Sequence, residues 1–256
     1  MLSADAQYRS LKGRTVFITG GGSGIGAEFV RAFANQGCKV AFVDVKKRDS
    51  RRVVTQLEST VEYIPRFFHC DISDVVALKR AIAQTGESLG EISVLINNAA
   101  DDARQRIEEV TVLQWDELMA VNQRPFFFAV QAVLPQMRRL GGGSIVNLGS
   151  ITWKIAQAGM PAYSMAKASV HGLTRSLART LGPLNIRVNT LVPGWVMTDK
   201  QTKKWVTRET EAVIDSAQCL KTRLLPRHIA SMALFLAADD SAVCTAQEFI
   251  VDGGWA

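Results

Sequence analysis

Thr19-Gly-Gly-Gly-Ser-Gly-Ile-Gly26 is a glycine-rich turn that follows a short apolar run and opens a helical pattern. The apolar run, residues 15–19, is rich in β-branched residues and predicts a strand. Because Gly20, Gly24 and Gly26 carry no Cβ, main-chain amides at the positive end of the helix can approach a pyrophosphate. The turn therefore predicts the first strand, turn and helix of a dinucleotide-binding α/β domain.

Similar apolar runs recur along the chain, separated mostly by longer helical patterns. They lie at residues 40–44, 67–70, 94–97, 144–148, 187–192 and 249–251. This alternation predicts a Rossmann-like, doubly wound parallel sheet of about seven strands with helices on both faces.

The composition predicts one domain over residues 1–256. The chain is 47% hydrophobic and 21% charged, which suits one large core. No stretch approaches about eighteen uninterrupted apolar residues, and residues 1–14 lack a secretory apolar core. Four widely separated cysteines show no spacing for a zinc site or a disulfide framework. We expect a soluble, cytoplasmic protein that does not enter a membrane.

The net charge of +6 is spread along the chain, with one local basic cluster at residues 46–52. These basic residues are better explained as solvent-exposed side chains of a loop and the start of a helix than as a binding site for a polyanion. Basic and aromatic residues do not interleave as nucleic-acid binding requires, and the three histidines are isolated. We expect neither a nucleic-acid partner nor a metal.

One segment, from Pro193 to about Leu220, departs from the regular pattern. It breaks at Pro-Gly and is polar, with two tryptophans and the paired Lys203 and Lys204. An insertion after the carboxyl end of a strand lies at the ligand crevice of such a sheet. Residues 194–220 are therefore predicted to form a flap over the active site, with a plain surface loop as the alternative.

Asp44 ends the second predicted strand, about twenty residues after the turn, where a carboxylate accepts both ribose hydroxyls of the adenosine half and repels a ribose phosphate. This position favours NAD over NADP. Lys46, Lys47 and Arg48 would weaken the preference if Asp44 turned away.

Tyr163 and Lys167 lie one helical turn apart, so both side chains face one cleft. A tyrosine with its usual pKa of about 10 is a poor base unless positive charge stabilises the phenolate, and Lys167 supplies that charge. We expect Tyr163 to remove a hydroxyl proton while a hydride leaves for a nicotinamide. The alternative is that Tyr163 is a structural core residue, but such a tyrosine would not need Lys167 beside it.

Together with Ser150, these residues follow the glycine-rich turn in the order and at the distances of the short-chain dehydrogenase/reductase family, which the chain resembles over nearly its whole length. The resemblance implies that Ser150 hydrogen-bonds the substrate oxygen. It also implies that Asn122, on a long helix beginning near Trp115, uses its backbone to hold a water on a proton relay from Lys167.

The same resemblance assigns cofactor contacts beyond the turn residues, which are Gly20, Ser23, Gly24, Ile25 and Gly26. Ser23 stands where family members that prefer NADP often carry a basic residue. Asp71 would bind the adenine amino group and Ile72 would pack on the ring, although Asp71 alternatively caps a helix that begins near Ser73.

Two further segments resemble cofactor-binding motifs of the family. Asn97-Asn98-Ala99-Ala100 resembles the Asn-Asn-Ala-Gly motif, so Asn98 would support the cofactor ribose. The segment after the sixth predicted strand implies that Val196 through its backbone and Thr198 through its hydroxyl contact the nicotinamide carboxamide. Helix capping ahead of Asp199 is the alternative for Thr198.

The substrate pocket is expected to combine residues after the fourth strand, after Ser150 and in the flap. Charged and amide groups beside flat rings suit a polyhydroxylated ring, whereas a steroid pocket would be more apolar. Alternatively, the tryptophans are core or flap residues and the acids face water. The candidates beside Ser150 and Tyr163 are Asp102, Trp153, Gln157 and Trp195, with Asp101, Arg104 and Trp205 nearby.

A closer resemblance is to bacterial NAD-dependent aldose 1-dehydrogenases of the D-xylose and galactose type. Its residues include Gly149 to Trp153, Ala217 to Lys221 and the ending Asp252 to Trp255. It implies oxidation of the anomeric hydroxyl of a free pentose or hexose to the aldonolactone. The family resemblance implies a homotetramer, in which the helices holding Asn122 and Tyr163 pair across a two-fold axis. The alternatives are a dehydrogenase of another polyol, sugar acid or secondary alcohol, a 3-oxoacyl thioester reductase, or a catalytically silent NAD-binding protein.

Overall fold

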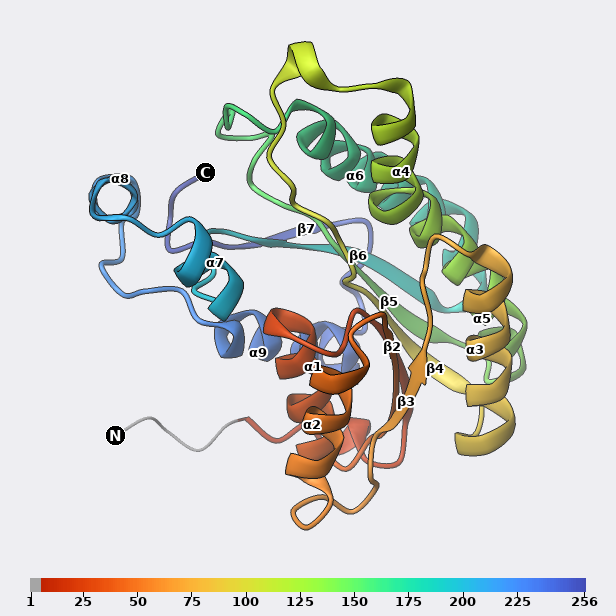
Figure 1. The fold of residues 1–256 in the computed structure, drawn as a ribbon. Helices are drawn as coiled ribbons and strands as arrows, with labels where there is room; N and C mark the ends of the chain where they lie inside the picture. Colours follow the sequence, from red (N-terminus) through yellow and green to blue (C-terminus); the bar gives the residue numbers. More distant parts are fainter. Residues whose placement is uncertain (1–5) are drawn as a thin grey trace.

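The computed structural model describes residues 6–256 as a parallel sheet covered by helices on both faces (Figure 1). The seven strands follow the order β3-β2-β1-β4-β5-β6-β7. This arrangement confirms the predicted Rossmann-like fold. The strands are β1 (Thr15–Thr19), β2 (Lys39–Asp44), β3 (Arg66–His69), β4 (Ile92–Asn97), β5 (Gly143–Leu148), β6 (Ile186–Pro193) and β7 (Glu248–Val251).

The inner strands are buried along almost their whole length because helices cover both of their faces. β1 is buried at every position, while the edge strands β3 and β7 are partly exposed. Such strands read as continuous apolar runs rather than as alternating patterns. For this reason, the strand ends predicted from the apolar runs agree with the observed ends to within one or two residues.

Two hydrophobic cores lie on opposite faces of the sheet. One is built under α1 (Gly24–Asn35), α2 (Lys47–Leu57) and α9 (Pro226–Ala237). The other is built under α3 (Val75–Leu89), α5 (Arg124–Arg139) and α6 (Pro161–Leu181). The short helix α4 (Val112–Asn122) packs against both α5 and α6. Within residues 6–256, each helix is too short or too polar to cross a membrane.

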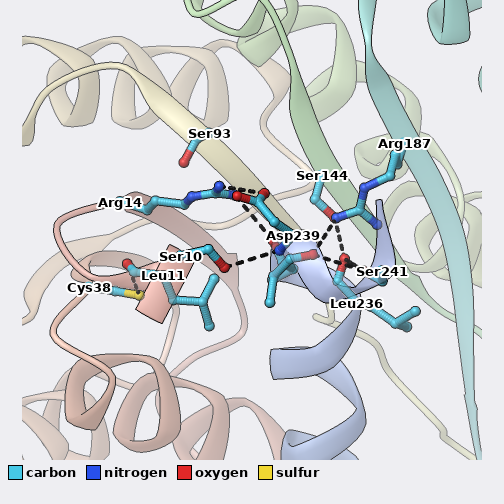
Figure 2. A network of polar contacts seen from close by, with 12 residues as sticks. Ser10, Leu11, Arg14, Cys38, Ser93, Ser144, Arg187, Leu236, Asp239 and Ser241 are labelled. Atoms are coloured by element: carbon cyan, nitrogen blue, oxygen red, sulfur yellow. Dashed lines mark hydrogen bonds and ion pairs between the residues drawn. The ribbon is translucent and has the colours of Figure 1, made fainter. Parts of the chain in front are cut away.

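A polar network closes the amino end of the sheet, where α9 stops (Figure 2). Arg14 donates to the Ala237 carbonyl at 3.4 Å and pairs with Asp239 at 2.6 Å. Arg187 donates to the Ala238 carbonyl at 3.1 Å. The two guanidinium groups thus bind carbonyls at the end of α9, where the helix itself supplies no donor and its dipole is negative.

The long helix expected around Asn122 is instead two helices that break at Gln123, whose backbone (φ −128°, ψ −59°) is not helical. Pro125 explains the break, since its ring would clash with the Val121 carbonyl in a continuous helix. The expectation of a mid-helix asparagine was therefore wrong, because Asn122 is the last residue of α4.

The segment predicted as an irregular flap contains two helices, α7 (Asp199–Lys204) and α8 (Arg208–Ala217). The side chains of Thr198 and Thr207 accept backbone N–H groups at the two helix starts. Caps of this kind stabilise short helices that carry few buried apolar residues. That the segment covers a substrate stays a prediction.

Candidate active site

The site lies at the carboxyl edge of the sheet, where the chain leaves β1, β2, β4, β5 and β6. In doubly wound sheets, ligands bind in this crevice, on either side of the point where the strand order reverses. Here the order reverses between β1 and β4.

The glycine-rich turn is packed so closely that side chains are excluded from it. Gly20 has φ +72°, and a Cβ on Gly26 would lie 1.8 Å from the Gly20 carbonyl oxygen. From the end of β4, the Asn98 side chain donates to the carbonyls of Thr19 at 3.0 Å and Gly20 at 3.1 Å. Asn98 therefore fastens the turn to β4, a contact that its sequence motif alone did not indicate.

Asp44 lies at the end of β2, buried to 9% exposure, with each carboxylate oxygen oriented by the backbone. One oxygen accepts the Gly22 N–H and the other accepts the Lys46 N–H, both at 2.8 Å. Because a carboxylate has about four lone-pair sites, acceptor capacity remains for ribose hydroxyls. The Lys46 ammonium lies beside this position and donates to Ser23 Oγ at 3.3 Å.

The residues expected around the adenine differ in exposure. Asp71 is exposed and accepts the Ser73 N–H at 2.9 Å, while Ile72 is only 6% exposed and packs in the second core. The helix start that Asp71 was alternatively expected to cap belongs to Asp74, whose side chain accepts the Ala77 N–H. Ile25 is partly buried and packs against the first core.

Val196 and Thr198 follow the carboxyl end of β6. Val196 is 4% exposed, so its side chain belongs to the core. Thr198 caps α7, and its methyl carbon would lie 3.3 Å from a Cβ on Gly24. Thr198 therefore has the capping role that was the alternative expectation and also lies beside the glycine-rich turn, while its contact with a nicotinamide stays a prediction.

The proposed catalytic residues lie where β5 ends beside the start of α6. They are Ser150, Tyr163 and Lys167. Ser150 follows β5, and the other two face it from the first turns of α6. The exposed fractions are 9% for Ser150, 9% for Tyr163 and 1% for Lys167. The Lys167 ammonium donates to the Leu148 carbonyl at 2.8 Å, and it lies 5.9 Å from the Tyr163 ring centroid.

Burial opposes the charged form of both groups. It lowers the pKa of the Lys167 ammonium to about 7, although the Asp102 carboxylate acts in the opposite direction. Burial also raises the pKa of Tyr163 above its usual value, Asp102 adds to the rise, and the Ser150 hydroxyl lowers it. Positive charge from Lys167 and from a bound nicotinamide therefore has to offset the cost of burying the phenolate, and this role of Lys167 stays a prediction.

Asn122 is fully buried and uses its side chain to hold the loop that follows β4. Its Oδ1 accepts the Asp101 N–H at 2.9 Å, and its Nδ2 donates to the Asp101 carbonyl at 3.0 Å. The side chain is therefore committed to positioning this loop, which leaves the backbone relay inferred from the family as a prediction.

Asp102, one residue further, is bound by the flap. Its carboxylate pairs with the Lys200 ammonium and accepts a hydrogen bond from the Gln201 amide at 2.5 Å. The Arg104 guanidinium lies 4.2 Å from the Trp205 ring centroid and 5.8 Å from that of Trp195. The loop after β4 and the flap thus contact each other through charge pairing and cation–π contacts.

Trp153 contacts α6 through His171. Its indole N–H donates to His171 Nε2 at 3.1 Å, and His171 Nδ1 lies 2.5 Å from a Glu248 oxygen. These contacts hold the Trp153 indole against α6, and its role in binding a substrate stays a prediction. Gln157 lies in the turn before α6, where its amide donates to the neighbouring Ala158 carbonyl.

Trp195 remains in the flap and stacks on Trp255 with ring centroids 6.4 Å apart. Trp255, Lys200 and Gln201 are site residues that the sequence did not indicate. The contacts of Lys200 and Gln201 join residues 98 and 99 positions apart, so only the folded chain shows them. Within residues 6–256, no three His, Cys, Asp or Glu side chains cluster in a way that would hold a metal ion.

Comparisons with known proteins agree with this geometry. A family model described as Enoyl-(Acyl carrier protein) reductase matches residues 20–256. The chain is 46% identical to a probable galactose dehydrogenase of Rhizobium meliloti, over 99% of each protein. It is 45% identical to a D-xylose 1-dehydrogenase of Caulobacter vibrioides, over 98% of this chain and 99% of the relative.

Among solved structures, the chain is similar to a blue fluorescent protein from a metagenomic library, crystallised in complex with NADPH. The two are 33% identical, with a TM-score of 0.89 over 96% of this chain and 99% of the other. The similarity extends over the sheet and both helical layers.

Proposed function

The chain belongs to the short-chain dehydrogenase/reductase family, and on that premise we propose that it is an NAD-dependent dehydrogenase of free aldoses. It would oxidise the anomeric hydroxyl of a pentose or hexose to the aldonolactone. The observation that carries the proposal is the flap-bound Asp102 carboxylate near Tyr163, since carboxylates suit hydroxyl-rich ligands. The two sugar dehydrogenases at 45–46% identity support the same substrate class.

A nicotinamide dinucleotide fits the residues at the carboxyl edge. The turn at residues 20–26 excludes side chains, as close approach of a pyrophosphate requires. Thr198 lies across from Gly24, where the nicotinamide half would lie. When bound, the cofactor supplies the hydride acceptor and positive charge beside the tyrosine.

The residues of this chain handle the proton. Tyr163 Oη takes the proton of the anomeric hydroxyl as the C–H hydride departs, so the sugar loses two electrons and forms the lactone carbonyl. Ser150 donates a hydrogen bond to the reacting oxygen. Lys167 in its charged form stabilises the phenolate, and both groups are buried, which strengthens that attraction.

Asp44 supports NAD over NADP, because its oriented carboxylate would accept ribose hydroxyls and repel a phosphate. Lys46 lies close enough to reach Ser23 and would attract a phosphate. We therefore propose a preference for NAD with residual use of NADP.

A groove between α4, α5 and α6 supports the proposed homotetramer. Its volume is about 640 Å³, and Met119, Phe126 and Leu173 contribute apolar side chains to it. Light scattering should give about four times the chain mass of 28.0 kDa. We also propose a cytoplasmic location, since all four cysteines are free, as is typical of a reducing compartment.

The function is tested by following NADH formation with NAD and a panel of D-xylose, L-arabinose, D-galactose and L-fucose. Parallel reactions use NADP, and an acetoacetyl thioester with NADPH. We expect saturable oxidation of at least one aldose with NAD. Turnover of the thioester alone would instead identify an acyl thioester reductase, and cofactor binding without any turnover would identify a silent NAD-binding protein.

A further inference from the structure

The carboxylate of Asp102 is held on both of its oxygens by side chains of the flap. The Lys200 ammonium pairs with Oδ1 and the Gln201 amide donates to Oδ2. Both donors lie in the first turn of α7, which is capped by Thr198. Consecutive residues of one helix thus fix the plane of the carboxylate.

The backbone of the same loop is fixed independently on each side of Asp102. On one side, Asn122 binds both the N–H and the carbonyl of Asp101. On the other side, the Gln105 N–H donates to the Gly159 carbonyl at 3.0 Å, just before α6. The position of the carboxylate is therefore determined by α4, α6 and α7 together.

The carboxylate of Asp102 is partly covered and lies within electrostatic reach of the reacting groups. Its side chain is 22% exposed, and its charge acts on both Tyr163 and Lys167. A carboxylate offers about four lone-pair sites, of which the two flap donors use one on each oxygen. The remaining sites are available to a ligand bound beside Tyr163.

We propose that Lys200 and Gln201 are positioning residues that hold Asp102 as the acceptor of a hydroxyl group of the sugar, and thereby determine selectivity for polyhydroxylated substrates. This inference rests on the proposed function. A fixed acceptor discriminates because a substrate that lacks the matching hydroxyl leaves a partly buried acceptor site of the carboxylate without a partner. A carboxylate free to turn toward water would lose that discrimination.

The experiment compares Lys200→Met and Gln201→Leu with Lys203→Met, an exposed lysine on the same helix that forms no ion pair within the described chain. Each protein is assayed with the preferred aldose and with its monodeoxy analogues at saturating NAD. Thermal unfolding and NADH binding are measured for every variant, so that a folding defect is recognised.

For the two test variants we expect the KM for the parent sugar to rise about tenfold, with a smaller change in kcat. The preference for the parent sugar over one deoxy analogue should fall by a similar factor. NADH binding and the unfolding temperature should match those of Lys203→Met. Lys200→Arg should restore most of the selectivity, because it keeps a charged donor.

Unchanged KM and unchanged selectivity in both test variants would overturn this inference. An equal loss of activity on the parent sugar and on every deoxy analogue would do the same, because it indicates a general effect of the flap. Absence of activity on any aldose in the unmodified enzyme would instead overturn the proposed function and, with it, the sugar-binding role of Asp102.

Discussion

At the scale of single residues, the site places a tyrosine and a lysine where burial opposes the charge of both. A structural tyrosine would need no such lysine beside it. Tyr163→Phe removes only the hydroxyl that takes the proton, so we expect kcat to fall by at least about 1,000-fold with NADH binding unchanged. Steady-state rates and fluorescence titration with NADH measure the two effects, and a near-normal rate would disprove the mechanism.

Asp102 should influence the pH dependence of this step. Its negative charge raises the pKa of Tyr163, so Asp102→Asn should lower that pKa. The rise of kcat with pH at saturating sugar should therefore move to lower pH. Asp101→Asn is the matched control, since Asp101 raises the same pKa by less and its variant should give a smaller shift in the same direction. A shift to higher pH would contradict this electrostatic account.

Lys167 should reduce stability in the absence of cofactor. Its pKa falls from 10.5 to about 7 on folding, so between these values the unfolded chain binds more protons and the free energy of unfolding rises with pH. Lys167→Met removes this dependence. We expect the variant to be more stable by a few kcal/mol at pH 7, with the difference vanishing near pH 10.5.

Urea denaturation of both proteins at several pH values within that window measures the difference. Groups that titrate equally in the two proteins cancel. A stability difference that stays constant with pH would show that Lys167 is not neutralised by burial.

At the scale of helices and strands, predictability followed the kind of interaction that decides each element. The strands were predictable because burial on both faces makes them continuous apolar runs. Tyr163 and Lys167 were recognisable because helical geometry places side chains four residues apart on one face. The α4–α5 break and the flap helices were missed because they depend on Pro125 and on two threonine caps within polar sequence.

The pairing of Asp102 with Lys200 and Gln201 was unpredictable for another reason. It joins two loops that only the assembled sheet brings together, and many charged residues are potential partners in a chain with 30 basic and 24 acidic residues. The contact of Trp153 with His171 was unpredictable for the same reason, because it depends on how the folded chain places His171 of α6 beside the turn before that helix and beside Glu248 of β7.

Asn122 connects α4 to the loop that carries Asp102. Asn122→Ala leaves the Asp101 N–H and carbonyl without partners, so we expect it to lower the free energy of unfolding by about 2 kcal/mol and to raise the KM for the sugar. Asn122→Asp keeps the acceptor for the Asp101 N–H and should lose less. Unfolding curves and KM values for both variants provide the test, and a fall in kcat alone would assign the side chain to the proton relay.

At the scale of the whole molecule, the two ends of the sheet have different tasks. The carboxyl end gathers Ser150, Lys167 and the glycine-rich turn, where burial of the Lys167 ammonium reduces stability. The amino end gathers the network around Arg14, Arg187 and the end of α9 (Figure 2), which contacts no residue of the site. The polar network at the amino end can therefore offset the free energy of unfolding that is lost at the carboxyl end.

This division predicts that stability and activity separate when the amino end is altered. Arg187→Met keeps much of the apolar stem but removes the donors to the carbonyls of Ala238 and Cys244. We expect the free energy of unfolding to fall by about 2 kcal/mol, because partly buried carbonyls lose charged partners. The kcat/KM for the sugar should stay within about twofold of the unmodified enzyme, since the network lies at the opposite end of the sheet from Tyr163. Denaturation curves and steady-state kinetics of the same preparation test this prediction. A large loss of kcat/KM in a folded variant would show that the amino and carboxyl ends of the sheet are coupled.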